Sequence, residues 1–209
     1  METAALTSFL FMGLALGLVH AFDPDHIAAV GGLSAGKGAG SSPVSSFRFG
    51  LQWSMGHGSA LLMVSIVVFV AGSAIPVHLS EYAERSVAFV LIVIGLMAFW
   101  RLLKSNSSKE EKGHSHMGAP LVGLLHGTAG SAPLLALIPI SQISQPIVGV
   151  VYVLFFSVGV ILAMTMLGGI FAHSLRMLDR FELPFCALIQ GVMAAFSLFL
   201  GIYLAVSAF

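Results

Sequence analysis

Long apolar runs alternate with short polar segments along this chain. Asp, Glu, Lys and Arg are absent from residues 49–80, 113–175 and 183–209. A helix needs about 20 predominantly apolar residues to cross a bilayer, and six segments meet that need. We place them at residues 4–33, 49–71, 82–103, 119–138, 147–171 and 184–207. Because lipid offers the backbone no hydrogen-bonding partner, each segment is predicted to be a helix.

The composition agrees with an all-α, polytopic membrane protein. Hydrophobic residues make up 57% of the 209 residues and charged residues only 9%, against about a quarter in soluble domains. The net charge of zero provides no basic surface for nucleic acid. The single cysteine excludes an internal disulfide and a cysteine-rich zinc site. Lipid is therefore an expected partner and nucleic acid is not, and the sequence permits a homo-oligomer.

The basic residues predict the orientation. Eight of the nine lie in the loops that follow the first, third and fifth segments, and only Arg85 lies on the opposite side. Cytoplasmic loops are enriched in Lys and Arg, so we expect both termini outside a bacterial inner (plasma) membrane. No positive region precedes the first segment, only Glu2, so we expect it to be a span and not a cleaved signal peptide.

Three pairs of matching segments indicate an internal repeat. Gly17 to Ala21 resembles Gly123 to Gly127, since both contain Gly-Leu, an apolar residue, His and a small residue. The order continues with two shorter matches, Ser54-Met55-Gly56 with Ser157-Val158-Gly159 and Gly95-Leu96 with Gly201-Ile202. An odd number of spans per repeat inverts the second copy, so we expect a 3+3 inverted repeat, an arrangement typical of transporters. Residues 1–104 and 119–209 are the predicted halves, joined by a cytoplasmic linker at 105–118.

Ionisable residues inside the predicted spans are costly and usually functional. Those that suit a metal are His20, Asp23, Asp25, His26, His57 and His126. Imidazole and carboxylate groups together suit divalent first-row metals such as nickel, cobalt and zinc. For a single histidine such as His57 or His126, a hydrogen-bonded core residue is the alternative, and Asp23 is also a candidate helix cap. His114 and His116 lie in the polar linker, where they bind metal weakly or are simply solvated.

Pro24 is predicted to interrupt the first span. It cannot donate the amide hydrogen bond that the carbonyl of His20 would accept, so we expect a kink or unwinding, with that carbonyl free as a further ligand. The interruption would also let Asp25 turn toward His20 and His26. Pro133 has the same relation to Ala129. Glycines near the histidines should let the helix backbones approach closely. These are Gly56, Gly58, Gly127 and Gly130.

The pattern H-x4-D-H at His20 to His26 resembles the signature helix of the nickel/cobalt transporter superfamily. Gly56 to Ser59 looks like that family's second motif. The six-span length, the Leu125 to Ser131 segment and the histidine-bearing linker resemble the shorter branch, which contains nickel/cobalt efflux and urease-accessory UreH-like membrane proteins. The resemblance implies divalent metal transport. It places four residues at metal-handling positions, namely His20, Asp25, His26 and His57.

One segment departs from the family's pattern. The uptake branch carries a Phe-Asp-Thr-Ala-Thr-Glu type motif in a later helix. Here Thr128-Ala129 stand in its place, but Gly127 and Gly130-Ser131 replace its acidic neighbours. The second half therefore lacks carboxylates, and His126 is its main candidate ligand.

The expected function is secondary transport of a divalent transition metal, nickel or cobalt first, by alternating access. The metal is a substrate, no cofactor is expected, and the chain is not expected to be an enzyme. One alternative is an intramembrane zinc-dependent hydrolase, although H-E-x-x-H is absent. Others are a haem-binding electron carrier with His57 and His126 as axial ligands, and a transporter of another solute whose His/Asp cluster relays protons.

Overall fold

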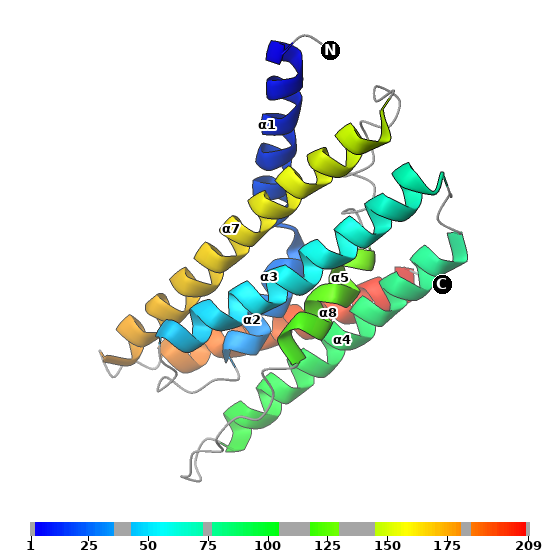
Figure 1. Ribbon diagram of the computed structural model, residues 1–209. Helices are drawn as coiled ribbons and strands as arrows, with labels where there is room; N and C mark the ends of the chain where they lie inside the picture. Colours follow the sequence, from blue (N-terminus) through cyan, green and yellow to red (C-terminus); the bar gives the residue numbers. More distant parts are fainter. Residues whose placement is uncertain are drawn as a thin grey trace.

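The computed structural model is helical wherever it describes the chain (Figure 1). It describes residues 3–35, 43–72, 77–104, 118–129, 145–180 and 185–207. Within these ranges there is no strand, and seven α-helices and one π-helical turn, η1, follow one another. Their bounds are α1 Thr3–His20, α2 Pro24–Ala35, α3 Pro43–Ser65, η1 Ile66–Val70, α4 Val77–Lys104, α5 Gly118–Thr128, α7 Pro146–Arg180 and α8 Phe185–Ser207.

Five helical stretches are long and apolar enough to cross a membrane, so the expectation of an all-α membrane-spanning chain agrees with the structure. They lie in α1, in α3 with η1, in α4, in α7 and in α8. The remaining expected span, 119–138, is represented by α5 alone. Residues 130–144, including Gly130 and Pro133, lie outside the described ranges, as does most of the linker with His114 and His116. The count of six spans therefore stays a prediction.

The first expected span is interrupted before Pro24. Helix α1 ends at His20 and α2 begins at Pro24, where proline suits the first helical position because no amide donor is needed there. The intervening turn is closed by the amide of Phe22, which donates to the carbonyl of Val19 at 3.0 Å. The expectation that the carbonyl of His20 would be free is wrong, because the amide of Asp23 donates to it at 3.0 Å.

The interruption lets one span contribute to two groups of helices. Helix α1 packs against α7, and α3 packs against both α5 and α7. Helix α2 packs instead with α4 and α8, which also lie side by side. Each group has its own buried core, around Trp53, Tyr152 and Phe156 in the first and around Ala28, Ala29 and Leu91 in the second. His20 and His26 therefore stand at the boundary between the two groups.

Glycines set the close contacts of the first group, and these contacts occur in matched pairs. At each of four glycines an added Cβ would fall on a backbone carbonyl group of the neighbouring helix. The contacts join Gly17 to Phe156 and Gly159 to Leu14 between α1 and α7, and Gly123 to Trp53 and Gly56 to Pro120 between α5 and α3. The sequence matches align Gly17 with Gly123 and Gly159 with Gly56. Continuing the same register aligns the contacted residues as well, Phe156 with Trp53 and Leu14 with Pro120.

The contact between α4 and α8 is reciprocal in the same way. A Cβ at Gly95 would lie 2.7 Å from the backbone nitrogen of Leu198, and one at Gly201 would lie 2.8 Å from that of Ile92. Beside them the hydroxyl of Ser197 donates to the carbonyl of Leu91 at 3.0 Å. Two of the three segment pairs thus lie at the contacts of α1 with α7 and of α5 with α3, and the third pair lies at the contact of α4 with its matching helix α8.

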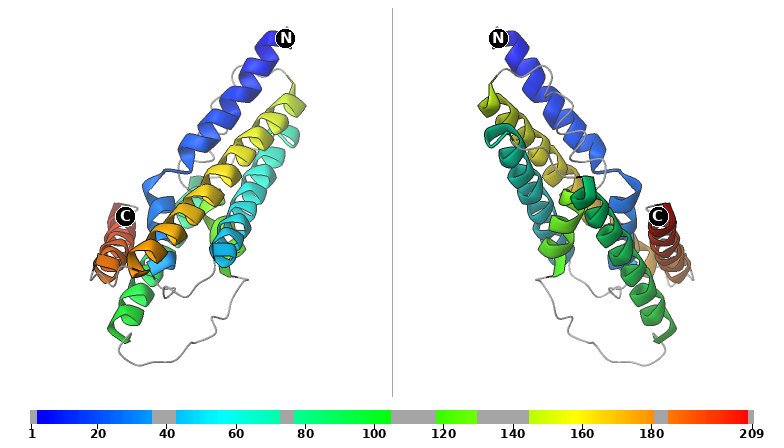
Figure 2. Two further views of the ribbon diagram at one scale, coloured as in Figure 1. Left: turned by 90° about the vertical axis from the view of Figure 1, so that its left-hand side faces the viewer. Right: turned by 90° about the vertical axis from the view of Figure 1, so that its right-hand side faces the viewer.

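The matched helices run in opposite directions. Figures 1 and 2 show α1 descending from the N-terminal end and α5 ascending, and α3 antiparallel to α7. The first turns of α3 and the last turns of α4 and α7 gather at the end opposite the N-terminus. Those turns contain most of the basic residues of the described helices, including Arg101 and Lys104 of α4.

The glycine contacts predict a position-specific cost of one added methyl group. Gly201→Ala should lower the stability of the detergent-purified protein by about 1–3 kcal/mol, because the new Cβ would overlap backbone atoms of α4. Gly191→Ala is the matched control on α8, since nothing lies within 4 Å of its added Cβ. Thermal unfolding of both variants checks this, and equal melting temperatures would contradict the packing described.

Candidate metal centre

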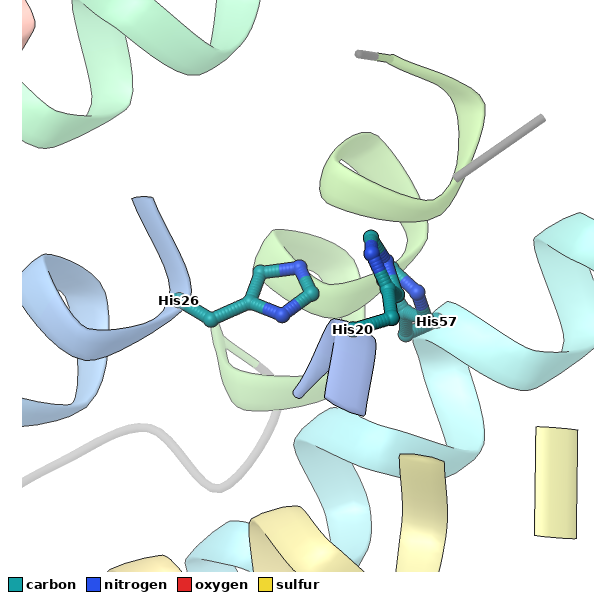
Figure 3. A group of neighbouring side chains, drawn as sticks. All are labelled: His20, His26 and His57. Carbon is teal, nitrogen blue, oxygen red and sulfur yellow. The ribbon is translucent and has the colours of Figure 1, made fainter. Parts of the chain in front are cut away.

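Three histidines from three helices meet beside the interruption of the first span. His20 ends α1, His26 lies in the first turns of α2, and His57 lies in the middle of α3 (Figure 3). Each offers a ring nitrogen within 4.8 Å of the others. Their ring centroids are 4.7 Å apart for His20 and His26, 5.0 Å for His26 and His57, and 5.4 Å for His20 and His57. All three are buried, with exposed fractions of 3% or less.

Helices α1 and α2 bring their histidines together because a non-helical turn separates the two helices. On a continuous helix His20 and His26 would be nearly two turns apart, about 9 Å along the axis. The turn at residues 21–23 instead changes the path of the chain between α1 and α2, and the two rings meet edge to face with an interplanar angle of 77°. His57 then approaches from α3 and completes the group, which we call the histidine triad.

His126 lies next to the triad without joining it. Its ring centroid is 6.0 Å from that of His26. Its Nδ1 is 2.9 Å from the carbonyl oxygen of Val122, and because a carbonyl only accepts, Nδ1 is the donor and Nε2 keeps its lone pair. That Nε2 is buried and has no hydrogen-bond partner in the structure. Helix α5, in the predicted second half of the chain, thus contributes one nitrogen at the edge of the site.

The two aspartates differ in their contact with the triad. Asp23 lies in the turn, and its Oδ2 is 2.9 Å from Nδ1 of His20, so it orients that ring and leaves Nε2 of His20 toward the site. Asp25 lies in the first turn of α2 and is partly buried. It is not among the residues of the triad, although the sequence placed it with them.

Glycines allow the backbones around the triad to approach one another. A Cβ added at Gly56 would overlap the carbonyl group of Pro120, and one at Gly127 would lie 2.5 Å from the carbonyl oxygen of His57. One at Gly58 would lie 3.3 Å from Cβ of Ser157. These contacts bring α5 and α7 against α3 at the level of His57.

Two aromatic residues that the sequence reasoning missed enclose the triad. Trp53 stacks on His57 with a centroid distance of 5.4 Å and an interplanar angle of 12°, and it meets His26 edge-on at 5.0 Å. Phe156 lies 5.4 Å from His20. Both are fully buried. A signal was present: each aromatic residue directly precedes one of the two matched Ser-x-Gly segments, and Trp53 lies one turn before His57 on α3.

The triad is rich in buried nitrogens without partners. Among the residues that the structure describes, neither ring nitrogen of His57 has a hydrogen-bond partner, nor has Nδ1 of His26 or Nε2 of His20. A buried polar group without a partner costs about 1–3 kcal/mol. Two nitrogens bound to one tetrahedral ion are about 3.4 Å apart, since each metal–nitrogen bond is about 2.1 Å. Small side-chain rotations would bring nitrogens now within 4.8 Å to that spacing, so the donor set fits a divalent transition metal.

Trp53 makes metal binding at the triad measurable. The chain has two tryptophans, and Trp100 is half-exposed near the end of α4. In a Trp100→Phe variant, open-shell Co²⁺ or Ni²⁺ bound by the triad should quench the fluorescence of Trp53. Asp23→Asn in that background should weaken the apparent affinity about 10–100-fold, because an outer partner of a ligating imidazole is lost.

A Trp53→Phe variant, which keeps only Trp100, is the control and should not be quenched at the same metal concentration. Equal titration midpoints with and without Asp23→Asn would contradict the role given to Asp23. Quenching that survives His57→Ala unchanged would contradict the triad itself.

Comparisons with known proteins give two similar sequences. The chain is 29% identical to the urease accessory protein UreH of Bacillus sp. (strain TB-90) over an aligned length of 193 residues, which covers 84% of this chain and 83% of that protein. It is 24% identical over 179 residues to the chloroplast protein FOR GROWTH AND FERTILITY 2 of Arabidopsis thaliana, covering 78% of this chain but 46% of that protein. No family model matches the chain, and no solved structure does. The similarity to UreH extends over most of both chains.

Proposed function

We propose that this protein is a secondary transporter that moves a divalent transition metal across a membrane. The observation that carries the proposal is the histidine triad, which places buried nitrogens without hydrogen-bond partners between helices long enough to span a bilayer. Such nitrogens are costly in an apolar interior unless they bind something. An ion held there would be a passing substrate, because the site stands between two groups of helices and not within one rigid core.

Charge supports a divalent ion. With neutral imidazoles, the charged groups next to the triad comprise two carboxylates, Asp23 in contact with His20 and Asp25 directly before His26 in the chain. Two carboxylates balance one dication, so the loaded site would be close to neutral overall. This matters because an unbalanced charge is expensive at the centre of a bilayer. A monovalent cation or an anion would leave the site charged.

Nickel or cobalt is the substrate that we propose, with zinc next. Imidazole is a borderline-soft ligand that suits all three metals. The H-x4-D-H motif adds the resemblance to the nickel/cobalt transporter superfamily, and the similarity to a urease accessory protein agrees with that resemblance. We place the protein in the shorter branch of that superfamily and in a bacterial inner membrane, with lipid and the metal ion as its partners.

Alternating access is the mechanism that we propose. The matched glycine contacts and the opposite directions of α1 and α5, of α3 and α7, and of α4 and α8 support a 3+3 inverted repeat of six spans. Basic residues at one end support an orientation with both termini outside. Tilting the α2–α4–α8 group against the α1–α3–α5–α7 group would expose the triad to one side and then to the other, with the turn at residues 21–23 as the hinge.

A zinc-dependent hydrolase is a second candidate, because three histidines with an open fourth position are also the ligand set of some catalytic zinc sites. Such an enzyme needs a free general base beside the metal. Here Asp23 already contacts His20. Transport by purified protein in sealed vesicles without turnover of an added ester or peptide would separate the two functions.

Cellular metal content tests the proposal. Cells that express the intact chain should differ from vector controls in nickel or cobalt content, measured by mass spectrometry, upward for uptake and downward for efflux. His26→Ala and Asp25→Asn should remove most of that difference. His173→Ala and Glu81→Gln are matched controls at exposed positions and should retain it. Full transport by both site variants at equal expression would contradict the proposal.

A further inference from the structure

Phe156 covers one side of the triad. Its ring lies 5.4 Å from that of His20 at an interplanar angle of 36°. Its backbone carbonyl packs on Gly17, which precedes His20 by three residues on α1. Because α1 descends from the N-terminal end of the molecule, Gly17 and Phe156 stand on the N-terminal-end side of His20.

Trp53 covers the other side. It stacks on His57, meets His26 edge-on, and lies 5.5 Å from His126. Its backbone carbonyl packs on Gly123, which precedes His126 by three residues on α5. Because α5 ascends toward the N-terminal end, Gly123 and Trp53 stand on the opposite side of the histidines.

The two aromatic residues therefore occupy matched positions. The backbone carbonyl of Phe156 packs on Gly17 of α1, and that of Trp53 packs on the matching Gly123 of α5. Trp53 directly precedes the segment Ser54-Met55-Gly56, and Phe156 directly precedes the matching segment Ser157-Val158-Gly159. Each also lies against a histidine of the triad, and both are fully buried. The inverted arrangement puts them toward opposite ends of the molecule, with the triad between them.

We propose that Trp53 and Phe156 are the two gates of the metal site, each closing it toward one membrane face. This inference rests on the proposed transport function and names the two residues that would open and close the site in turn. A large apolar ring against the ligands excludes water and so blocks a hydrated ion. With the basic helix ends in the cytoplasm, Trp53 closes the cytoplasmic side and Phe156 the outer side. Both rings belong to the α1–α3–α5–α7 group, so each gate would open by rotation of its own side chain off the triad.

The gates differ in chemistry as well as in position. The indole nitrogen of Trp53 is buried without a hydrogen-bond partner, whereas Phe156 has no polar atom. Opening on the Trp53 side would expose that nitrogen to water and relieve its cost, but opening on the Phe156 side offers no such gain. Replacing Trp53 should therefore change the balance between the two open forms more than replacing Phe156.

Sided labelling of a reporter thiol tests the gates without any metal. Cys186 is the chain's only cysteine, so His57→Cys in a Cys186→Ser background places a single thiol at the site. A membrane-impermeant thiol reagent is added to intact cells for the outer face and to inverted vesicles for the cytoplasmic face. The reporter alone should label slowly from both faces, since residue 57 is fully buried.

Trp53→Ala should then speed labelling about tenfold or more from the cytoplasmic face, and Phe156→Ala by a similar factor from the outer face. Phe199→Ala, on the lipid-facing side of α8, is the control and should change neither rate. If an alanine variant does not purify as a folded protein, Trp53→Leu or Phe156→Leu replaces it, with the same sidedness expected.

The gate proposal is wrong if both variants speed labelling of the thiol from the same face. It is also wrong if neither variant speeds labelling from either face. If Trp53→Ala speeds labelling from the outer face and Phe156→Ala from the cytoplasmic face, the two gates are supported and the proposed orientation is wrong. Because the assay contains no metal, correct sidedness in a protein that moves no metal would reject the transport function and leave the gates standing.

Discussion

Burying imidazole nitrogens without hydrogen-bond partners in an apolar interior is costly, and this cost governs the histidine site. His20, His26 and His57 are buried among helices whose outer faces are apolar, and most of their ring nitrogens have no hydrogen-bond partner. A fold assembled for stability alone would replace such groups by aliphatic side chains of similar size. The interruption of the first span, the glycine contacts and the enclosing aromatic rings all serve to hold these nitrogens close together.

The interruption at residues 21–23 is the feature that makes the site possible. A continuous helix would separate His20 from His26, whereas the turn places them in contact and sends α1 and α2 into different helix groups. The glycines then set how closely α3, α5 and α7 approach, and they do so in matched pairs on opposed helices. This one interruption of the helix thus brings the histidines together and separates the two helix groups.

The sequence predicted the helical class, the interrupted span and the residues His20, His26 and His57, because apolar runs, a proline and buried ionisable groups have direct physical consequences. It did not predict that the His20 carbonyl would accept a hydrogen bond from the amide of Asp23, or that the Asp23 carboxylate would contact the His20 ring. Those outcomes depend on the local path of the turn, which a motif spacing does not specify. Trp53 and Phe156 were overlooked because an aromatic residue in a span is indistinguishable from core packing until its neighbours are known.

The central claim is that the three imidazoles together bind a divalent metal. X-ray absorption at the nickel edge, on purified protein loaded with one equivalent of Ni²⁺, examines that claim most directly. We predict a first shell with about three imidazole nitrogens near 2.0–2.1 Å, the usual metal–nitrogen distance for histidine. A first shell of oxygen atoms alone, with no scattering from imidazole rings, would contradict the account.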